Sequence, residues 1–191
     1  MRILVIYAHP NPGSFNRAIL EAFTKGLGDA GHAVEILDLY DLRFEPRLRM
    51  ADFAQFTGGE MPGDVRTQQE KVAKADALAF IYPVWHWRAP AILEGWLQRV
   101  FSHGFAFRLG PQGVEGILKH EKVLIISTTN GREELYKASG IEAAMRTLDS
   151  AMFIHVCGIQ HVEHVFLYEV GRDAELRKSY LERAYRLGKT F

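Results

Sequence analysis

The sequence predicts an α/β fold in which a parallel β-sheet lies between two layers of helices. Short apolar runs rich in branched residues recur along the chain, amphipathic helical segments separate them, and the two kinds of segment alternate five times. Continuous apolar runs are typical of strands buried on both faces, as in parallel sheets. Strict alternation requires right-handed crossovers, which place helices on both faces of the sheet.

Five segments are expected to form the strands. Three are continuous apolar runs, over residues 3–7, 77–82 and 123–126. The segment over 34–39 alternates partially between apolar and polar residues, and the segment over 162–167 is more polar than the others. Five parallel strands with alternating helices favour the flavodoxin-like strand order 2-1-3-4-5 in a three-layer sandwich.

Five segments between and after these strands are expected to be helices. The first carries Ile19, Leu20, Phe23 and Leu27 at the spacing of one helix face. The expected helices cover residues 16–27, 65–74, 90–101, 141–153 and 174–187. Residues 43–63 contain two prolines and three glycines, and predict a long surface excursion. Long excursions in compact domains are often functional.

Composition limits the classes of function. The 191 residues fit one domain, which we expect to span residues 1–191, and the 23 basic and 23 acidic residues balance. This balance gives no electrostatic footprint for nucleic acid or an anionic membrane. No apolar run is long enough for a membrane span. The lone cysteine, Cys157, suits a reducing compartment, so we expect a cytoplasmic protein.

Three loops should meet at the carboxyl edge of the sheet, where ligands of such folds bind. The first loop holds His9 and delivers a helix start with Ser14 as N-cap. A phosphate could lie on Ser14, Phe15 and Asn16, because amides at a helix start bind anions. Taken alone, this segment is more readily interpreted as an ordinary capped turn.

The second and third loops are rich in aromatic and hydrogen-bonding side chains. The second contains Pro83, Val84, Trp85, His86 and Trp87, and its tryptophans could enclose a flat aromatic ligand or plug the loop. The third, Thr128, Thr129, Asn130 and Gly131, offers hydroxyls, an amide and a close backbone approach, or forms a polar turn. The ligand hypothesis gains strength because all three loops share one edge.

Several stretches in a fixed order carry a family resemblance. They are Tyr-Ala-His-Pro at 7–10, Ser-Phe-Asn at 14–16, Tyr-Pro at 82–83, Pro-Ala-Ile-Leu-Glu-Gly-Trp-Leu-Gln-Arg-Val-Phe at 90–101, Phe-Ala-Phe at 105–107, Thr-Thr-Asn-Gly at 128–131, and Tyr136. In order and spacing, the chain resembles the NAD(P)H:quinone oxidoreductases from its start to about residue 165. That family includes the modulator of drug activity B and ancillary flavoproteins of potassium-efflux systems.

The resemblance implies a flavin cofactor. It places the flavin phosphate at His9, Ser14, Phe15 and Asn16, the isoalloxazine ring against residues 83–87, and the ring edge at residues 128–131. Tyr136 corresponds to an active-site tyrosine beside the flavin carbonyls. We expect FAD rather than FMN, because residues 43–63 are long enough to cover an adenosine half; FMN is the alternative.

The resemblance also implies an enzyme that transfers two electrons from NAD(P)H to a quinone or similar small acceptor by a ping-pong hydride mechanism. A homodimer is expected, with residues 90–101 and 105–107 at its interface. The alternative function is a regulatory flavoprotein bound to a membrane potassium-efflux system. An electron carrier of the flavodoxin type fits poorly, because such carriers tend to be acidic.

The chain departs from the family at particular positions. Asn130 precedes Gly131 where relatives often have two glycines, and His86 and Trp87 are often absent in this form. Glu142 stands where some members place a histidine that partners the tyrosine. We expect Glu142 to turn to solvent in the first turn of its helix, since acidic residues suit that position; a buried, protonated glutamate is the alternative.

Four potential metal ligands, His155, Cys157, His161 and His164, cluster in the sequence. Their spacing matches no standard closed zinc site, and His161 and His164 should lie on opposite faces of a strand. We expect no metal there. Cys157 should be unreactive, because a helix C-terminus disfavours a thiolate.

Overall fold

The computed structural model describes residues 1–191 and contains a five-stranded parallel sheet in the order β2-β1-β3-β6-β7. The strands are β1 (Arg2–Tyr7), β2 (Ala33–Asp38), β3 (Ala77–Pro83), β6 (Val123–Thr128) and β7 (Val162–Leu167). This order is the predicted 2-1-3-4-5 once the short hairpin strands are set aside. The α/β fold and its strand order are therefore confirmed.

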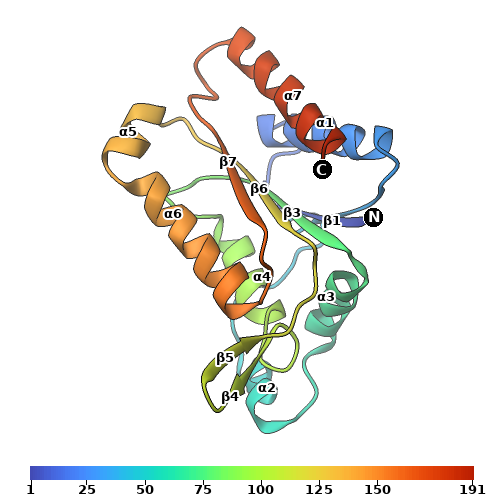
Figure 1. The fold of residues 1–191 in the computed structure, drawn as a ribbon. Helices are drawn as coiled ribbons and strands as arrows, with labels where there is room; N and C mark the ends of the chain where they lie inside the picture. The colour runs from blue at the N-terminus through green and yellow to red at the C-terminus, as the bar shows by residue number, and fades with distance from the viewer.

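Helices cover both faces of the sheet, as Figure 1 shows. One face carries α1 (Phe15–Asp29) and α7 (Ala174–Lys189), which pack on Ile3, Val5 and Tyr7 of β1. The opposite face carries α3 (Gly63–Lys74), α4 (Ala91–Val100) and α6 (Ile141–Asp149). Because strand side chains alternate, Leu4 and Ile6 join the core on this second face.

Helices α1 and α7 approach each other through glycines. A Cβ on Gly26 would lie 2.2 Å from the carbonyl oxygen of Tyr185, and one on Gly188 would lie 2.1 Å from that of Phe23. Both positions therefore require glycine for this packing.

Elements that the sequence did not predict lie mainly at the end of the molecule away from the predicted site. They are η1 (Met50–Phe53), α2 (Ala54–Thr57), the antiparallel pair β4 (Phe107–Gly110) and β5 (Gly113–Gly116), and α5 (Glu133–Ala138), which alone lies near the site. The predicted helix over 141–153 is α6 continued by a π-helix, η2 (Ser150–Val156).

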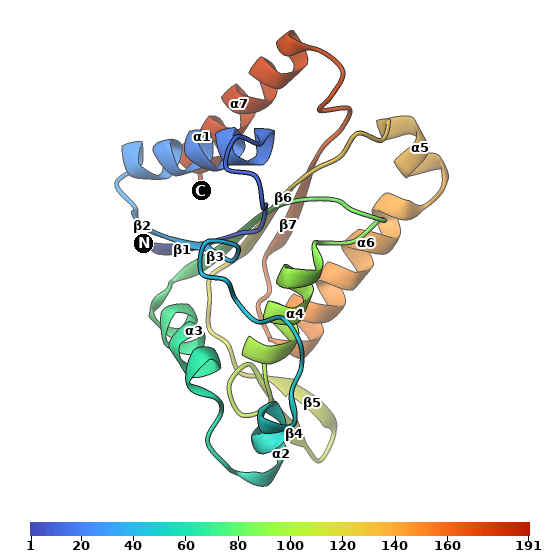
Figure 2. The same cartoon turned by 180° about the vertical axis from the view of Figure 1, so that it is seen from behind.

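Figure 2 shows the segment after β2 running past α4 to α2. It is anchored there: His103 donates its amide to Gln55 Oε1 at 2.8 Å, and the rings of Phe56 and His103 stack at 5.7 Å. The excursion over residues 43–63 is therefore partly helical and leads away from the carboxyl edge of the sheet.

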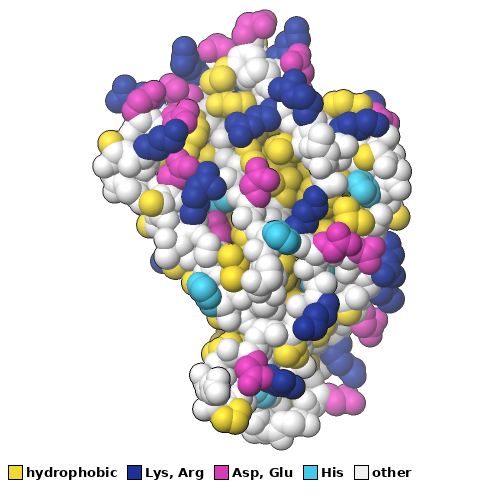
Figure 3. All heavy atoms as spheres, viewed as in Figure 1, with side chains coloured by type: hydrophobic (Ala, Val, Ile, Leu, Met, Phe, Trp, Pro, Cys, Tyr) yellow, Lys and Arg dark blue, Asp and Glu magenta, His cyan; other side chains and the backbone are white.

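Figure 3 shows basic and acidic side chains interspersed over the face in view. No helix of the structure combines the length and apolarity that crossing a bilayer requires.

Candidate functional site

The three predicted loops meet at the carboxyl ends of β1, β3 and β6 and enclose one cavity of about 490 Å³, which we call the loop cavity. Its lining comprises His9, Phe15, Asn16, Pro83, Val84, Trp85, His86, Trp87, Thr128, Thr129, Asn130, Gly131, Tyr136 and Val170. All predicted site residues except Ser14 thus line the same space.

Ser14 instead organises the first loop from behind. Its Oγ accepts the amide of Arg17 at 3.2 Å, so it is the N-cap of α1, and it lies 3.1 Å from the hydroxyl of Tyr7. The amides of Phe15 and Asn16 belong to the first turn of α1, where no preceding turn supplies acceptors. This end of the cavity is therefore suited to an anionic group.

Asn16 presents an unpaired acceptor. The side chain is 4% exposed, and its Nδ2 donates to Thr128 Oγ1 at 2.8 Å. Its Oδ1 is buried and has no hydrogen-bond partner. An unpaired buried acceptor is costly, and Asn16 lines the loop cavity, so a hydrogen-bond donor bound there would satisfy it.

The second loop is a tight, strained turn. Trp85 and Arg88 exchange backbone hydrogen bonds of 2.9 and 3.0 Å, and the two residues between them, His86 and Trp87, have φ values of 49° and 64°. Left-handed backbone is unfavourable for such bulky residues and is concentrated at ligand sites. The turn leaves the side chains of Trp85 and Trp87 40% and 50% exposed at the mouth of the loop cavity.

The third loop holds Tyr136. The hydroxyl of Tyr136 lies 2.7 Å from Thr129 Oγ1, which also accepts the amide of Gly131 at 3.0 Å. A Cβ on Gly131 would lie 2.4 Å from Cε2 of Tyr136, so glycine is required beside this ring. Burial raises the pKa of Tyr136, which is 1% exposed, and the phenol is therefore neutral at physiological pH.

Glu142 does not turn to solvent as expected, although it does lie in the first turn of α6. It accepts a hydrogen bond of 2.7 Å from the Tyr168 hydroxyl and pairs with Arg146 at 2.8 Å, with 14% of its side chain exposed. Burial works to raise the pKa of Glu142, but Tyr168 and Arg146 outweigh it and leave the pKa below its ordinary value. The prediction was wrong because it considered only the helix terminus and not the strand behind it.

No group of three His, Cys, Asp or Glu residues lies close enough to hold an ion. Cys157 is fully buried, and burial raises the pKa of its thiol to about 12. His164 belongs to a buried chain that the sequence did not predict. Its Nδ1 lies 2.7 Å from Asp149 Oδ2, and its Nε2 lies 2.7 Å from Ser127 Oγ.

The Ser127–His164–Asp149 chain has the order of a hydrolase triad, but Ser127 is completely inaccessible within β6. Burial lowers the pKa of His164, so its neutral ring donates to Asp149 and accepts from Ser127. The chain therefore fixes Asp149 against the sheet. The three residues lie on separate elements, so no sequence spacing could have revealed them.

Val170 is the lining residue that the sequence analysis missed. It follows β7, whose carboxyl end opens onto the same edge, and its amide donates to the Thr129 carbonyl at 3.1 Å. The sequence did predict this fifth strand, so the loop that follows it could have been added to the three loops expected at the carboxyl edge of the sheet.

Comparison with known proteins agrees with this architecture. The family model described as "flavodoxin-like fold" matches residues 1–191. An uncharacterized NAD(P)H oxidoreductase of Haemophilus influenzae is 31% identical over 96% of this chain and 92% of its own length. NAD(P)H dehydrogenase [quinone] 1 of Cavia porcellus is 31% identical over 89% of this chain and 69% of its own length.

A solved structure gives the same result. The NAD(P)H:quinone oxidoreductase from Methanothermobacter marburgensis is 35% identical, with a TM-score of 0.90 over 100% of this chain and 96% of its own. The chain belongs to the flavodoxin-like fold family and, within it, to the NAD(P)H:quinone oxidoreductases.

Proposed function

We propose that this protein is a flavin-dependent oxidoreductase that transfers two electrons from NAD(P)H to quinones or similar small acceptors. The observation that carries the proposal is the loop cavity, whose wall combines an open helix terminus, exposed tryptophans and the unpaired Asn16 Oδ1. Relatives named for this activity support it. The alternative, a regulatory subunit of a potassium-efflux system, is not favoured by these relatives.

The residues present fit a flavin. Its phosphate would bind the first-turn amides of α1, and Asn16 Oδ1 would accept a hydroxyl or ring N–H. The turn over residues 85–88 would pack on the flat ring system, and Thr129, Asn130 and Gly131 would face its polar edge. Bound there, a flavin supplies hydride acceptance and donation. In this proposal, residues 1–191 form one flavin-binding domain of a cytoplasmic protein.

The overall reaction balances as NAD(P)H plus a proton plus quinone giving NAD(P)⁺ plus hydroquinone. Donor and acceptor use the loop cavity in turn, as a ping-pong cycle requires. Tyr136 is the proposed catalytic residue. Thr129 Oγ1 accepts the Gly131 amide, and we propose that the Thr129 hydroxyl donates to Tyr136, which leaves the Tyr136 proton for the reacting group.

The position of residues 43–63 in the structure favours FMN over the expected FAD. FAD was expected because residues 43–63 could cover an adenosine half, yet η1 and α2 pack against the segment around His103 at the other end of the molecule. Only the stretch 46–48 approaches the turn over residues 85–88. We therefore propose FMN as the cofactor.

We also propose a homodimer. The outer face of α4 carries the half-buried side chain of Ile92, and Phe105, which follows the helix, is likewise incompletely covered. A second copy would bury these groups.

The test is an absorbance spectrum of the purified protein, followed by NAD(P)H oxidation assays with a quinone. We expect a flavin spectrum and quinone-dependent turnover. Asn16→Leu should weaken flavin binding, measured by fluorescence on titration, while Gln112→Leu, at the exposed turn between β4 and β5, should not. A colourless protein that takes up neither FMN nor FAD would refute the proposal.

A further inference from the structure

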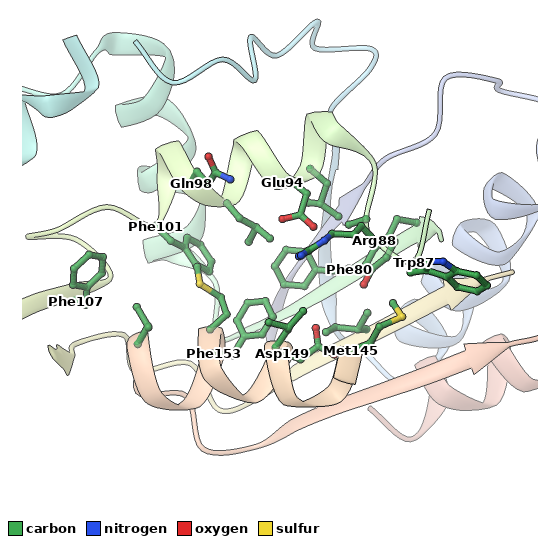
Figure 4. A pocket seen from close by; sticks show the side chains of 18 residues that line it. Phe80, Trp87, Arg88, Glu94, Gln98, Phe101, Phe107, Met145, Asp149 and Phe153 are labelled. Carbon is green, nitrogen blue, oxygen red and sulfur yellow. The ribbon is translucent and has the colours of Figure 1, made fainter. Parts of the chain in front are cut away.

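A second cavity lies between α4 on one side and α6 with η2 on the other, and we call it the α4–α6 groove. Its volume is about 370 Å³. The groove adjoins the loop cavity, because Trp87 lines both. Figure 4 shows Trp87 at one end of the groove and Phe107 at the other.

The lining of the groove changes along its length. Phe101, Phe107 and Phe153 lie toward the end far from Trp87, whereas Arg88, Glu94 and Asp149 lie nearer to Trp87 (Figure 4). The far end is thus mainly apolar, with Gln98 beside Phe101, whereas the near end adds hydrogen-bonding groups to Phe80 and Met145. A cavity of this kind fits an amphipathic small molecule, with its polar part beside Trp87.

Two polar groups at the near end are prepared for a ligand. Tyr82 is 5% exposed, lines the groove and makes no side-chain hydrogen bond within the chain. Asp149 points into the groove while the Ser127–His164 chain holds its Oδ2 from behind. The Tyr82 hydroxyl is not bonded within the chain, so it is free to form a hydrogen bond with a group in the groove.

We infer that the α4–α6 groove binds the substituent of an extended acceptor, so that the preferred substrates are quinones bearing a long apolar chain. This inference rests on the proposed function. The quinone ring lies in the loop cavity, Trp87 flanks its exit, Tyr82 and Arg88 donate to the outer oxygen atoms of the ring, and the chain occupies the apolar end. A partner copy packed along α4 would cover the open side of the groove and leave its lining unchanged.

The test compares a benzoquinone with the same ring carrying a decyl chain. For the flavin-loaded protein we expect a kcat/KM at least about tenfold higher for the decyl compound, mainly through a lower KM, because a buried apolar substituent discriminates by such factors. Equilibrium binding, followed by quenching of tryptophan fluorescence, should show the same preference.

The diagnostic variant is Leu148→Trp. Leu148 lines the groove and is 53% exposed, so a larger apolar side chain can enter the groove without disturbing the core. It should reduce the preference for the decyl compound to near unity in both kinetics and binding. The matched control is Leu42→Trp, since Leu42 is 48% exposed and does not line the groove; it should keep the preference.

The outcomes separate the two proposals. Equal affinity of the wild-type protein for both quinones, or a preference that Leu148→Trp leaves intact, would overturn the groove assignment. So would conversion of a dimer to a monomer by Leu148→Trp in light scattering, because a second copy would then occupy the groove. Chain-dependent binding without turnover would instead refute the proposed enzyme activity and retain the groove.

Discussion

At the scale of single residues, Tyr136 is the sharpest test of the site. Its hydroxyl is held by Thr129 and its ring by Gly131. Removing the hydroxyl in Tyr136→Phe should slow hydride transfer by up to about tenfold, the value of one neutral hydrogen bond of about 1 kcal/mol. Stopped-flow measurement of flavin reduction by NAD(P)H gives this rate directly.

The matched control for Tyr136→Phe is Tyr185→Phe. Tyr185 also donates its hydroxyl to another side chain, Asp29 at 3.0 Å, but lies on the outer helix α7. Its loss should leave the rate of flavin reduction unchanged. A rate for Tyr136→Phe equal to that of the wild type would remove Tyr136 from the mechanism.

Glu142 should contribute to stability rather than to hydride transfer, because its partners are Tyr168 and Arg146 and not Tyr136. The pKa of Glu142 is lower in the folded than in the unfolded protein. The ionised side chain therefore stabilises the fold fully above the unfolded pKa of about 4.3. This stabilisation is lost as the pH falls through the folded pKa. Glu142→Gln should therefore lower the free energy of unfolding by about 1 kcal/mol at pH 7.

Urea denaturation at pH 7 and pH 3 measures this effect, and the difference between wild type and Glu142→Gln should shrink at the lower pH. Glu134→Gln, at an exposed position on α5, is the control and should have little effect at either pH. A large loss of hydride transfer in Glu142→Gln would return Glu142 to the mechanism.

At the scale of elements, Arg99 joins α4 to the excursion after β2. The guanidinium is completely buried and bonds both oxygens of the equally buried Asp52 in η1, at 3.1 and 3.0 Å. It also donates to Asp64 of α3 at 2.8 Å. Arg99→Met would leave the Asp52 charge buried and unpaired, and should cost about 3–5 kcal/mol of stability.

The double variant Arg99→Met with Asp52→Asn should recover part of that loss, because no net charge then remains buried. Urea denaturation of both variants and the wild type gives the comparison. If Arg99→Met alone were as stable as the wild type, the ion pair would not hold the excursion in place.

Elements with strong periodicity were predictable, and those defined by distant partners were not. The predicted boundaries of β7 are those of the structure, and α1 and α3 differ by at most two residues at either end. The helices η1 and α2 within the excursion were not predicted, because they depend on Arg99 and His103, which lie far along the chain. The spacing of apolar residues over 141–153 predicted one continuous helix and could not show where α6 changes to the π-helix η2.

At the scale of the whole molecule, we expect a dimer. Light scattering of the flavin-loaded protein should give twice the mass of the chain, because α4 and the segment after it leave apolar side chains partly uncovered. A fully active monomer at the concentration of the assay would contradict this prediction.

The size of the cofactor is a separate expectation for the molecule as a whole. Mass spectrometry of the compound released by denaturation should give the mass of FMN, since η1 and α2 lie away from the loop cavity. Detection of FAD would show that other parts of the protein or a second copy accommodate the adenosine half.

The sequence by itself determined the layered fold, the strand order and the three loops, because buried strands and amphipathic helices leave local patterns and because parallel strands end at a common edge. It also named nearly all the residues that line the loop cavity. The tertiary structure decided what depends on distant partners: the hydrogen bond from Tyr168 to Glu142, the fixing of Asp149 by His164, and the α4–α6 groove. Such contacts arise from packing between separate elements, and no local pattern along the chain encodes them.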